Sequence, residues 1–403
     1  IKTNGGGKSI FNSVTSKYVS YTGSSNNIQI TDDVTTDNQR WTIAYVTSEF
    51  QISNLALTTR RLQYNSGSPR YAAYTGSQRD ISLYKLATTT WTGNTNTDWA
   101  IAGNWSNGVP TGSTHAIIPD VTNAPIIGAS TNAAVFNLTI TEADGLVINS
   151  GGTLIVNGTS SGNVTYNRNL GTSNWYLISA PVSGQVANDA YVTANNIALG
   201  TGNNRGIANY QTATNTWEYL QATGVGTFSN GIGYSVKRAS AGNISFTGTI
   251  NTSDVSVGVS NAGTGFNLLG NPFTSFINSA TLLTDNGTNL VSTDIWVFNQ
   301  SSGNYEVKNL AASFVLAPAQ GFFVRSSNGT NVSISESYQV ATGNAFQKTA
   351  KPEITLNMTD GSNNRFAKIY YLDNATTSFD NGYDGETFGG IANTTDVFTH
   401  LVA

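Results

Sequence analysis

The sequence predicts an all-β protein built from several small modules. Its 403 residues include 41 glycines and no cysteine, and only 10% of the side chains are charged. Glycine, serine, threonine and asparagine favour short strands joined by polar turns, whereas strong helix formers are sparse here. At about 150 residues per domain, the length predicts two to four domains. Internal repeats support the same division.

The composition also excludes several classes of function. A formal charge of −4 leaves no basic patch of the kind that binds phosphate backbones, so no nucleic-acid partner is expected. Without cysteine there is no thiolate nucleophile, no disulfide framework and no Cys-rich zinc site. No apolar run approaches the roughly 20 residues of a membrane helix, so no membrane-spanning segment is expected. Because the chain begins at Ile1, we expect it to be a mature or partial piece of a longer product.

Residues 1–86 contain a short internal echo. Residues 17–24 (KYVSYTGS) match residues 70–77 (RYAAYTGS) without a gap. Each copy places aromatic and aliphatic residues around a Thr-Gly turn, which predicts a hairpin repeated within a small β-barrel or trefoil-like module. Gln39-Arg40-Trp41 resembles the Gln-x-Trp element of ricin-type lectins. Residues 62–85 resemble a small β-module appended to secreted enzymes of Bacteroidetes.

Residues 91–160 are predicted to form a β-solenoid-like segment. Short alternating strands at 137–140, 145–148 and 152–156 are separated by Gly, Asn and Ser corners. Each strand can stack its apolar face on the previous coil. The tryptophan-rich stretch from 91 to 110 resembles the opening of β-solenoid segments in large bacterial surface proteins.

Trp91, Trp99 and Trp105 in that opening allow two roles. They form either a buried cap or a sugar-binding platform, and Tyr21 and Tyr74 of the N-terminal module are candidates for the same sugar-binding role. Polysaccharide is therefore one candidate partner.

Residues 163–345 carry an internal duplication, with copies at about 163–255 and 256–345. Three motifs recur in the same order at an offset of roughly 90 residues, which coincidence would not preserve. The matched pairs are residues 174–181 with 266–273, 210–217 with 298–305, and 231–237 with 319–325. Each copy is expected to contain about four strands, so the two copies predict a duplicated β-sandwich.

Residues 351–403 are predicted to begin a C-terminal β-sandwich. Segments 352–358 and 366–372 read as strands, and an acidic, aromatic stretch follows them. This order resembles the start of the C-terminal sorting region of type IX secretion cargo in Bacteroidetes (Flavobacterium-like), in the longer variety found on surface chitinases.

That resemblance implies export across the outer membrane to the cell surface or the extracellular medium. It implies type IX outer-membrane components as partners, namely a β-barrel shuttle and the translocon. It also implies that Phe379, Tyr383 and Phe388 pack the domain that is presented to this machinery.

Candidate catalytic groups are few. A Ser-His-Asp arrangement needs a histidine beside an activated serine, and only His115 and His400 are available, with no nucleophile-elbow pattern near them. Asp380, Asp384 and Glu386 are either solvated turn acids or ligands of a surface-bound Ca²⁺ ion. We expect no catalytic residue and no other cofactor, so this segment is not expected to be an enzyme.

Two functions remain open from the sequence. The first is a non-catalytic part of a large secreted or cell-surface protein exported by the type IX system, with spacer and adhesive modules before a C-terminal sorting domain. The second is a carbohydrate-binding accessory region of a secreted hydrolase whose catalytic domain lies upstream.

Overall fold

A computed structural model gives the fold of most of the chain. It describes residues 2–12, 15–23, 25–47, 49–83, 86–141, 145–300, 303–312, 314–341, 353–359 and 364–370, together with residues 376, 378, 379, 385 and 397. The fold is all-β and multi-domain, with only two short α-helices among these residues. The chain divides into two compact units, Ile1–Leu86 and Ala87–Ala403.

The N-terminal unit consists of two antiparallel sheets around a small core. The strands are β1 (Lys2–Asn4), β2 (Gly7–Ser9), β3 (Phe11–Asn12), β4 (Lys17–Ser20), β5 (Gln29–Thr31), β6 (Trp41–Val46), β7 (Glu49–Asn54), β8 (Arg61–Asn65) and β9 (Arg70–Tyr74). One sheet has the order β1-β2-β6-β7-β8-β9 and the other β3-β4-β5. Tyr21, Trp41, Ile52, Leu62 and Ala73 form the core.

The sequence echo in this unit corresponds to β4 and β9, and each strand is followed by the same Thr-Gly turn. Residue 23 and residue 76 are the glycines of the repeated Thr-Gly turn, and their φ angles are 99° and 98°. A left-handed φ of this size favours glycine, because a side chain there would be strained. Both copies therefore need glycine for the same reason.

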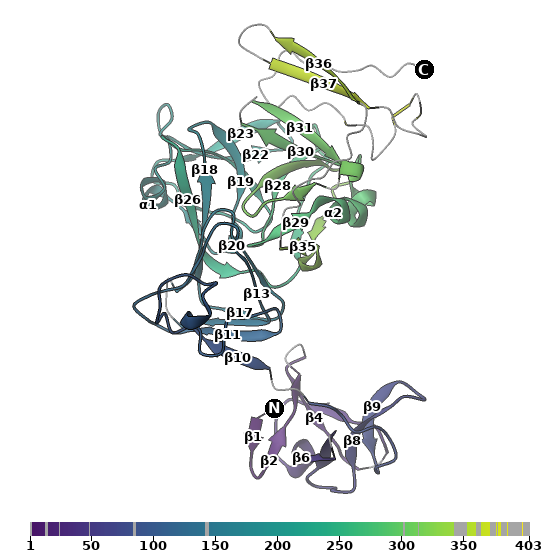
Figure 1. Ribbon diagram of the computed structural model, residues 1–403. Helices are drawn as coiled ribbons and strands as arrows, with labels where there is room; N and C mark the ends of the chain where they lie inside the picture. The colour runs from purple at the N-terminus through teal and green to yellow at the C-terminus, as the bar shows by residue number, and fades with distance from the viewer. Residues whose placement is uncertain are drawn as a thin grey trace. The chain divides into compact units, whose positions relative to one another are not determined.

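The next segment is a β-solenoid of parallel strands (Figure 1). Its strands are β10 (Ala87–Thr90), β11 (Thr114–Ile118), β12 (Ile126–Ile127), β13 (Asn132–Val135), β14 (Asn137–Ile140), β15 (Val147–Ile148), β16 (Thr153–Val156), β17 (Ser160–Ser161) and β18 (Val164–Leu170). They form three parallel ladders, β10-β11-β14-β17, β12-β15-β18 and β13-β16. Inward residues stack from coil to coil, for example Ile118 on Ile140 and Ile127 on Ile148.

The duplicated region follows, and its two copies have the same topology. The elements of copy 1 are β18, β19 (Trp175–Ser179), β20 (Val182–Ser183), β21 (Val186–Ala187), α1 (Asp189–Ala194), β22 (Asn204–Gln211), β23 (Thr216–Gln221), β24 (Gly226–Thr227), β25 (Gly233–Lys237) and β26 (Gly242–Ile250). Those of copy 2 are β27 (Val255–Val257), β28 (Phe266–Gly270), β29 (Phe276–Asn278), α2 (Ser279–Asn286), β30 (Asp294–Asn299), β31 (Asn304–Asn309), β32 (Val315–Leu316), β33 (Gly321–Arg325), β34 (Val332–Ile334) and β35 (Gln339–Val340).

The main sheets have the orders β19-β25-β22-β23 and β28-β33-β30-β31, so the strand order is the same in both copies. The accessory pairs β18·β26 and β21·β24 likewise correspond to β27·β34 and β29·β32. When the copies are aligned by strand register, Trp217 is equivalent to Tyr305 and Tyr234 is equivalent to Phe322, as the repeat predicts. The same register makes Trp175 equivalent to Phe266, whereas the sequence motifs match residue 174 with Phe266, so the two alignments differ by one residue here.

Each copy also contains a helix that the sequence pattern did not predict. Asn188 caps α1 by accepting a hydrogen bond from the Tyr191 N–H at 2.9 Å. Asn278 caps α2 by accepting one from the Ala280 N–H at 2.9 Å. The helices have only 6 and 8 residues, too few for a clear helical period in the sequence.

At the C-terminal end, β36 (Glu353–Thr359) and β37 (Asn364–Tyr370) form an antiparallel hairpin. Arg365 hydrogen-bonds to Asn304 of β31, which ties this hairpin to copy 2. No helix in the described part of the chain has the length and apolar character that a membrane crossing requires.

Candidate functional site

The five aromatic residues predicted as a carbohydrate platform are buried. The exposed fractions of Trp91, Trp99 and Trp105 are 1%, 1% and 5%, and those of Tyr21 and Tyr74 are 0% and 5%. A buried ring offers no face to a sugar, so the platform interpretation is wrong for these five residues.

The three tryptophans instead close the first coil of the solenoid. Trp105 packs edge-on against Trp91 and Trp99, with ring centroids 5.0 and 4.7 Å apart. The Trp91 indole N–H donates to the Asn123 carbonyl at 2.7 Å, and that of Trp105 donates to the Trp99 carbonyl at 2.9 Å. They form the buried cap that was the alternative interpretation.

The other predicted site residues lie largely outside the described residues. This holds for Asp380, Asp384 and Glu386 of the candidate Ca²⁺ site, and for His400. Among the described residues, no three His, Asp or Glu side chains gather in a way that could hold a metal ion. His115 forms a hydrogen bond between its Nε2 and Thr139 Oγ1 on the next solenoid coil, at 3.0 Å.

The predicted packing residues of the C-terminal domain are only partly covered by the structure. Tyr383 and Phe388 lie outside the described residues. Phe379 is 43% exposed, so the one described member of the set is not buried in a core.

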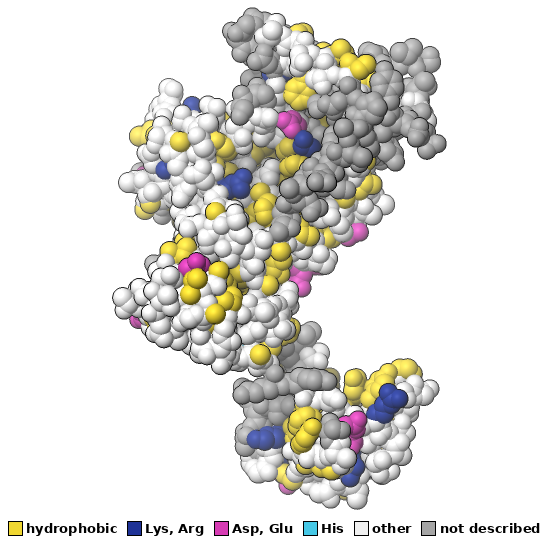
Figure 2. All heavy atoms as spheres, in the orientation of Figure 1, with side chains coloured by type: hydrophobic (Ala, Val, Ile, Leu, Met, Phe, Trp, Pro, Cys, Tyr) yellow, Lys and Arg dark blue, Asp and Glu magenta, His cyan; other side chains and the backbone are white. Residues whose placement is uncertain are grey.

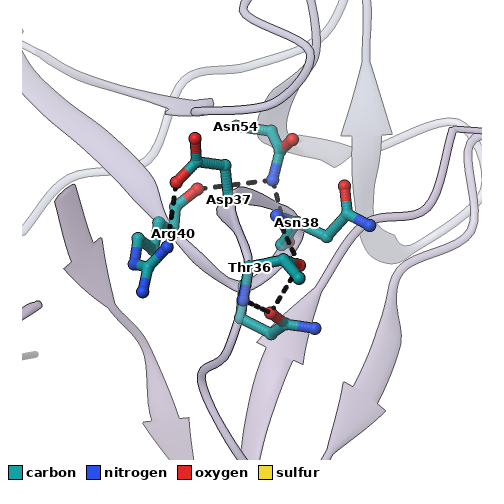
Figure 3. Close-up of polar contacts among 6 residues, drawn as sticks. Thr36, Asp37, Asn38, Arg40 and Asn54 are labelled. Atoms are coloured by element: carbon teal, nitrogen blue, oxygen red, sulfur yellow. Dashed lines mark hydrogen bonds and ion pairs between the residues drawn. The ribbon is translucent and has the colours of Figure 1, made fainter. Parts of the chain in front are cut away.

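The Gln-x-Trp element is part of the fold of the N-terminal unit, and Figure 3 shows the polar contacts of the turn that leads into it. The Thr36 N–H donates to Gln39 Oε1 at 2.9 Å, which caps the short turn before β6. Arg40 pairs with Asp37 at 3.0 Å. Trp41 is fully buried, and its indole N–H donates to the Val19 carbonyl at 3.1 Å.

The exposed aromatic rings of this unit lie elsewhere, on three hairpins. Cross-strand pairs are formed by Phe11 with Tyr18, Tyr45 with Phe50, and Tyr64 with Tyr71. Their ring centroids are 4.9, 5.0 and 5.1 Å apart, with interplanar angles of 50°, 53° and 48°. One ring of each pair is well exposed.

In the second unit, an aromatic layer lies between the two main sheets of the duplicated region. Phe323 is fully buried there, with its centroid 4.9 Å from that of Tyr210 and 5.6 Å from that of Tyr305. Burial raises the pKa of both tyrosines above the ordinary phenol value, because the layer disfavours the charged phenolate.

The copies meet across this layer by reciprocal backbone contacts. The Ser179 N–H donates to the Ala319 carbonyl at 3.2 Å, and the equivalent Gly270 N–H donates to the Gly231 carbonyl at 2.9 Å. Isolated bridges join Ile178 to Gln320, and Leu269 to Ile232. These pairs are equivalent under exchange of the copies, so the packing has approximate twofold symmetry.

A groove of about 180 Å³ interrupts the aromatic layer on the side of copy 1. The residues that line it are Trp175, Tyr176, Leu177, Trp217, Tyr219, Ser235, Phe298 and Tyr305. The rings of Trp175 and Tyr219 meet at 61° with centroids 5.9 Å apart. Both rings are partly exposed, so they can contact a bound molecule.

The groove exists because copy 1 has small residues where copy 2 has large ones. The register pairs Ser235 with Leu177 in copy 1, and Phe323 with Leu268 in copy 2. Ala208 of copy 1 is likewise equivalent to Trp296 of copy 2. In the corresponding hairpins, Ala208 pairs with Tyr219 and Trp296 pairs with Val307. The aligned motifs already contained the exchange of serine for phenylalanine, which was the available sequence signal for this groove.

A second groove, of about 420 Å³, is lined by residues of both copies. Its lining combines polar side chains, among them Asn209, Gln211 and Asn267, with apolar ones such as Ile232 and Leu268. The Asn267 amide is already engaged, because its Oδ1 accepts from the Ser260 N–H at 2.8 Å and its Nδ2 donates to the Gly265 carbonyl at 2.7 Å. The second groove therefore offers side-chain amides where the first offers mainly aromatic rings.

Charge contributes little to either surface. On the face that Figure 2 shows, charged side chains are few and scattered among polar and hydrophobic ones. Beside the first groove, the Lys237 ammonium lies 6.0 Å from the centre of the Trp175 ring. This geometry is a cation–π contact that helps to hold the Trp175 ring in place.

Two family models match parts of the chain. A model described as the Clostridium botulinum HA-17 domain matches residues 2–99, and a domain of unknown function, DUF8693, matches residues 90–159. The first covers the N-terminal unit and the opening of the solenoid, and the second covers the solenoid. No curated protein and no solved structure matches the chain. Neither family model points to Bacteroidetes or to type IX secretion.

Proposed function

We propose that this chain is a non-catalytic part of a secreted or cell-surface protein, in which β-modules space and present adhesive surfaces. The observation that carries the proposal is the set of aromatic pairs in the N-terminal unit. Phe11, Tyr45 and Tyr71 are 43%, 66% and 58% exposed, each on a different hairpin. Aromatic residues are enriched where proteins bind partners, because a rigid ring supplies a large contact area at low entropic cost.

The solenoid suits the role of a spacer. Each of its coils pairs with its neighbours through parallel ladders, so its stability depends mainly on contacts between adjacent coils. Such a segment can lengthen a protein without a new core for every module. The bacterial HA-17 domain match covers the unit that carries the exposed aromatic pairs.

The proposal includes export by the type IX route. It is supported by the resemblance of residues 351–403 to a sorting region, and by the β36–β37 hairpin at the predicted first two strands. The proposed partners are the outer-membrane shuttle and translocon of that system, and the proposed location is the cell surface or the medium.

Adhesion is tested with the full chain carrying Phe11→Ser, Tyr45→Ser and Tyr71→Ser together. We expect retention on immobilised cell-envelope polysaccharide and on intact bacterial cells to fall at least tenfold. The matched control is Ile30→Ser, since Ile30 is 60% exposed in the same unit but is aliphatic. Unchanged retention of the triple variant would contradict the adhesive role.

Export is tested in the parent protein by deleting everything after Lys351. We expect the truncated protein to disappear from the extracellular and surface fractions and to accumulate inside the cell. Undiminished appearance outside the cell would show that the terminal region is a further β-module and no sorting signal.

The aromatic groove favours a second candidate function, a carbohydrate-binding accessory region of a secreted hydrolase. The residues upstream of Ile1 in the parent distinguish the two candidates, because a hydrolase domain there would select the second. Under both, this chain itself turns over no substrate. Reproducible hydrolysis by the purified chain, abolished by changing one acidic residue, would contradict both.

A further inference from the structure

The groove between the two copies has the features of a site for a small neutral ligand. Its lining includes rings from both copies, Trp175, Trp217 and Tyr219 from copy 1 and Phe298 and Tyr305 from copy 2. It is smaller than the usual pocket for a drug-sized molecule, which occupies roughly 300–1,000 Å³. A single ring-sized group matches its volume of about 180 Å³.

The lining excludes a ligand bound mainly by charge. None of the eight described lining residues is acidic or basic. The neighbouring Lys237 ammonium faces the Trp175 ring. A ligand here must therefore gain its affinity from contact with rings and from neutral hydrogen bonds.

The groove also offers hydroxyl groups. Ser235 lies in it, and among the described residues no group hydrogen-bonds to the Ser235 hydroxyl. Tyr219 and Tyr305 add phenol hydroxyls to the same lining. The site thus combines apolar ring faces with neutral donors and acceptors.

We propose that this groove binds one ring of a neutral saccharide, stacked on Trp175 and Tyr219 and hydrogen-bonded to Ser235. A pyranose has an apolar face of C–H groups, which suits the negative face of an aromatic ring, and hydroxyls at its edge, which suit a serine hydroxyl. The inference rests on the second candidate function, the carbohydrate-binding one that this groove favours, and deepens it by naming the ligand class of the groove; the adhesive role of the N-terminal unit is independent of it.

The test measures binding of neutral tetrasaccharides of glucose, N-acetylglucosamine, mannose and galactose to the full chain, by calorimetry and by tryptophan fluorescence. We expect at least one to bind, and Trp175→Ala and Tyr219→Ala each to weaken it at least tenfold. Trp175→Phe installs the residue of copy 2 and is expected to retain much of the affinity. Ser235→Phe installs the ring of Phe323 and is expected to abolish binding by filling the groove.

The control is Leu199→Ser, which changes a side chain of copy 1 that is 71% exposed and does not line the groove, and it should leave the affinity unchanged. Tyr71→Ala is measured beside it, because Tyr71 belongs to the proposed adhesive surface of the other unit. Thermal melts of all variants establish that they are folded. Absence of binding by all four tetrasaccharides, or binding that Trp175→Ala leaves intact, would overturn the proposal. Loss of binding in Tyr71→Ala alone would place the sugar on the N-terminal unit, which overturns this site while preserving the adhesive function. A tryptophan fluorescence response to a synthetic peptide of residues 371–403, with no response to any of the saccharides, would overturn the proposal and make the groove a docking site for the chain itself.

Discussion

The two copies of the duplicated region share a topology but differ in the face that they turn toward each other. Copy 2 fills its face with Trp296 and Phe323, which are 1% and 0% exposed. Copy 1 has Ala208 and Ser235 at the same positions, and Ser235 lines a groove. The comparison teaches that strand order depends on the apolar pattern of the strands and on their turns, whereas the size of individual inward side chains can diverge.

The largest expected effect is a difference in the free energy of unfolding between equivalent substitutions in the two faces. Phe323→Ala removes a fully buried ring that contacts Tyr210 and Tyr305, so we expect it to lower the free energy of unfolding by about 3–5 kcal/mol. Ser235→Ala at the equivalent position removes only a hydroxyl beside a groove, and we expect a change below about 1 kcal/mol. Urea unfolding of both variants measures the difference. Equal losses would mean that the copies are packed alike and that the groove is no true gap.

The next largest effect is expected at the contact between Gly270 and Ser179, near the approximate twofold axis. Gly270 lies against Ser179, its own equivalent in copy 1, and a Cβ added to Gly270 would overlap the Ser179 side chain. We expect Gly270→Ala to cost about 1–3 kcal/mol through overpacking.

The same contact allows a rescue that makes the comparison sharper. Adding Ser179→Gly to Gly270→Ala exchanges which copy carries the side chain and should recover part of the lost stability. Ser179→Gly alone should destabilise modestly, since the Ser179 hydroxyl donates to the Asn271 carbonyl at 2.8 Å. A double-mutant cycle by urea unfolding measures the coupling, and strict additivity would mean that the two positions do not compete for space.

The architecture of this chain could be predicted from its sequence better than the groove could. The solenoid and the duplication could be predicted because each repeats a short apolar pattern, and repetition makes a weak local signal strong. The sequence left two roles open for the tryptophans because it does not reveal burial: Trp91 and Tyr21 have the residue type of a sugar platform, yet both lie in cores. The groove is lined by residues up to about 130 positions apart, such as Trp175 and Tyr305, and no local pattern specifies that they come together.

A smaller effect tests whether the helices of the two copies are equivalent. Asn188→Ala and Asn278→Ala each remove a side-chain cap from the first turn of a helix. We expect each to lower stability by about 1 kcal/mol, because one backbone N–H loses its partner. The matched change Asn174→Ala, at an exposed position before β19, serves as the control. A loss in one copy only would show that the other helix is held by its packing alone.

The smallest expected effect is on pH dependence, and its sign differs between the copies. In copy 1 the pKa of Asp189 is lowered, first by the hydrogen bond from the Thr223 N–H and then by Arg205, whose Nε donates at 2.9 Å. In copy 2 the pKa of Glu336 is raised, first by burial and then by the negative charge of Asp254. One carboxylate therefore favours folding when ionised, and the other favours folding when protonated.

The pH window follows from these directions. The Asp189 contribution is present above the ordinary aspartate pKa of about 3.9, and it is lost as the pH falls through the lowered value in the folded protein. The Glu336 contribution is present below the ordinary glutamate pKa of about 4.3, and it is lost as the pH rises through the raised value. Asp189→Asn should therefore destabilise at pH 7 and approach neutrality at pH 3, whereas Glu336→Gln should stabilise slightly at pH 7 and lose that advantage at pH 3. Urea unfolding at the two pH values separates them: a parallel response would mean that both carboxyl groups share one electrostatic environment, and that the copies differ only in the aromatic layer.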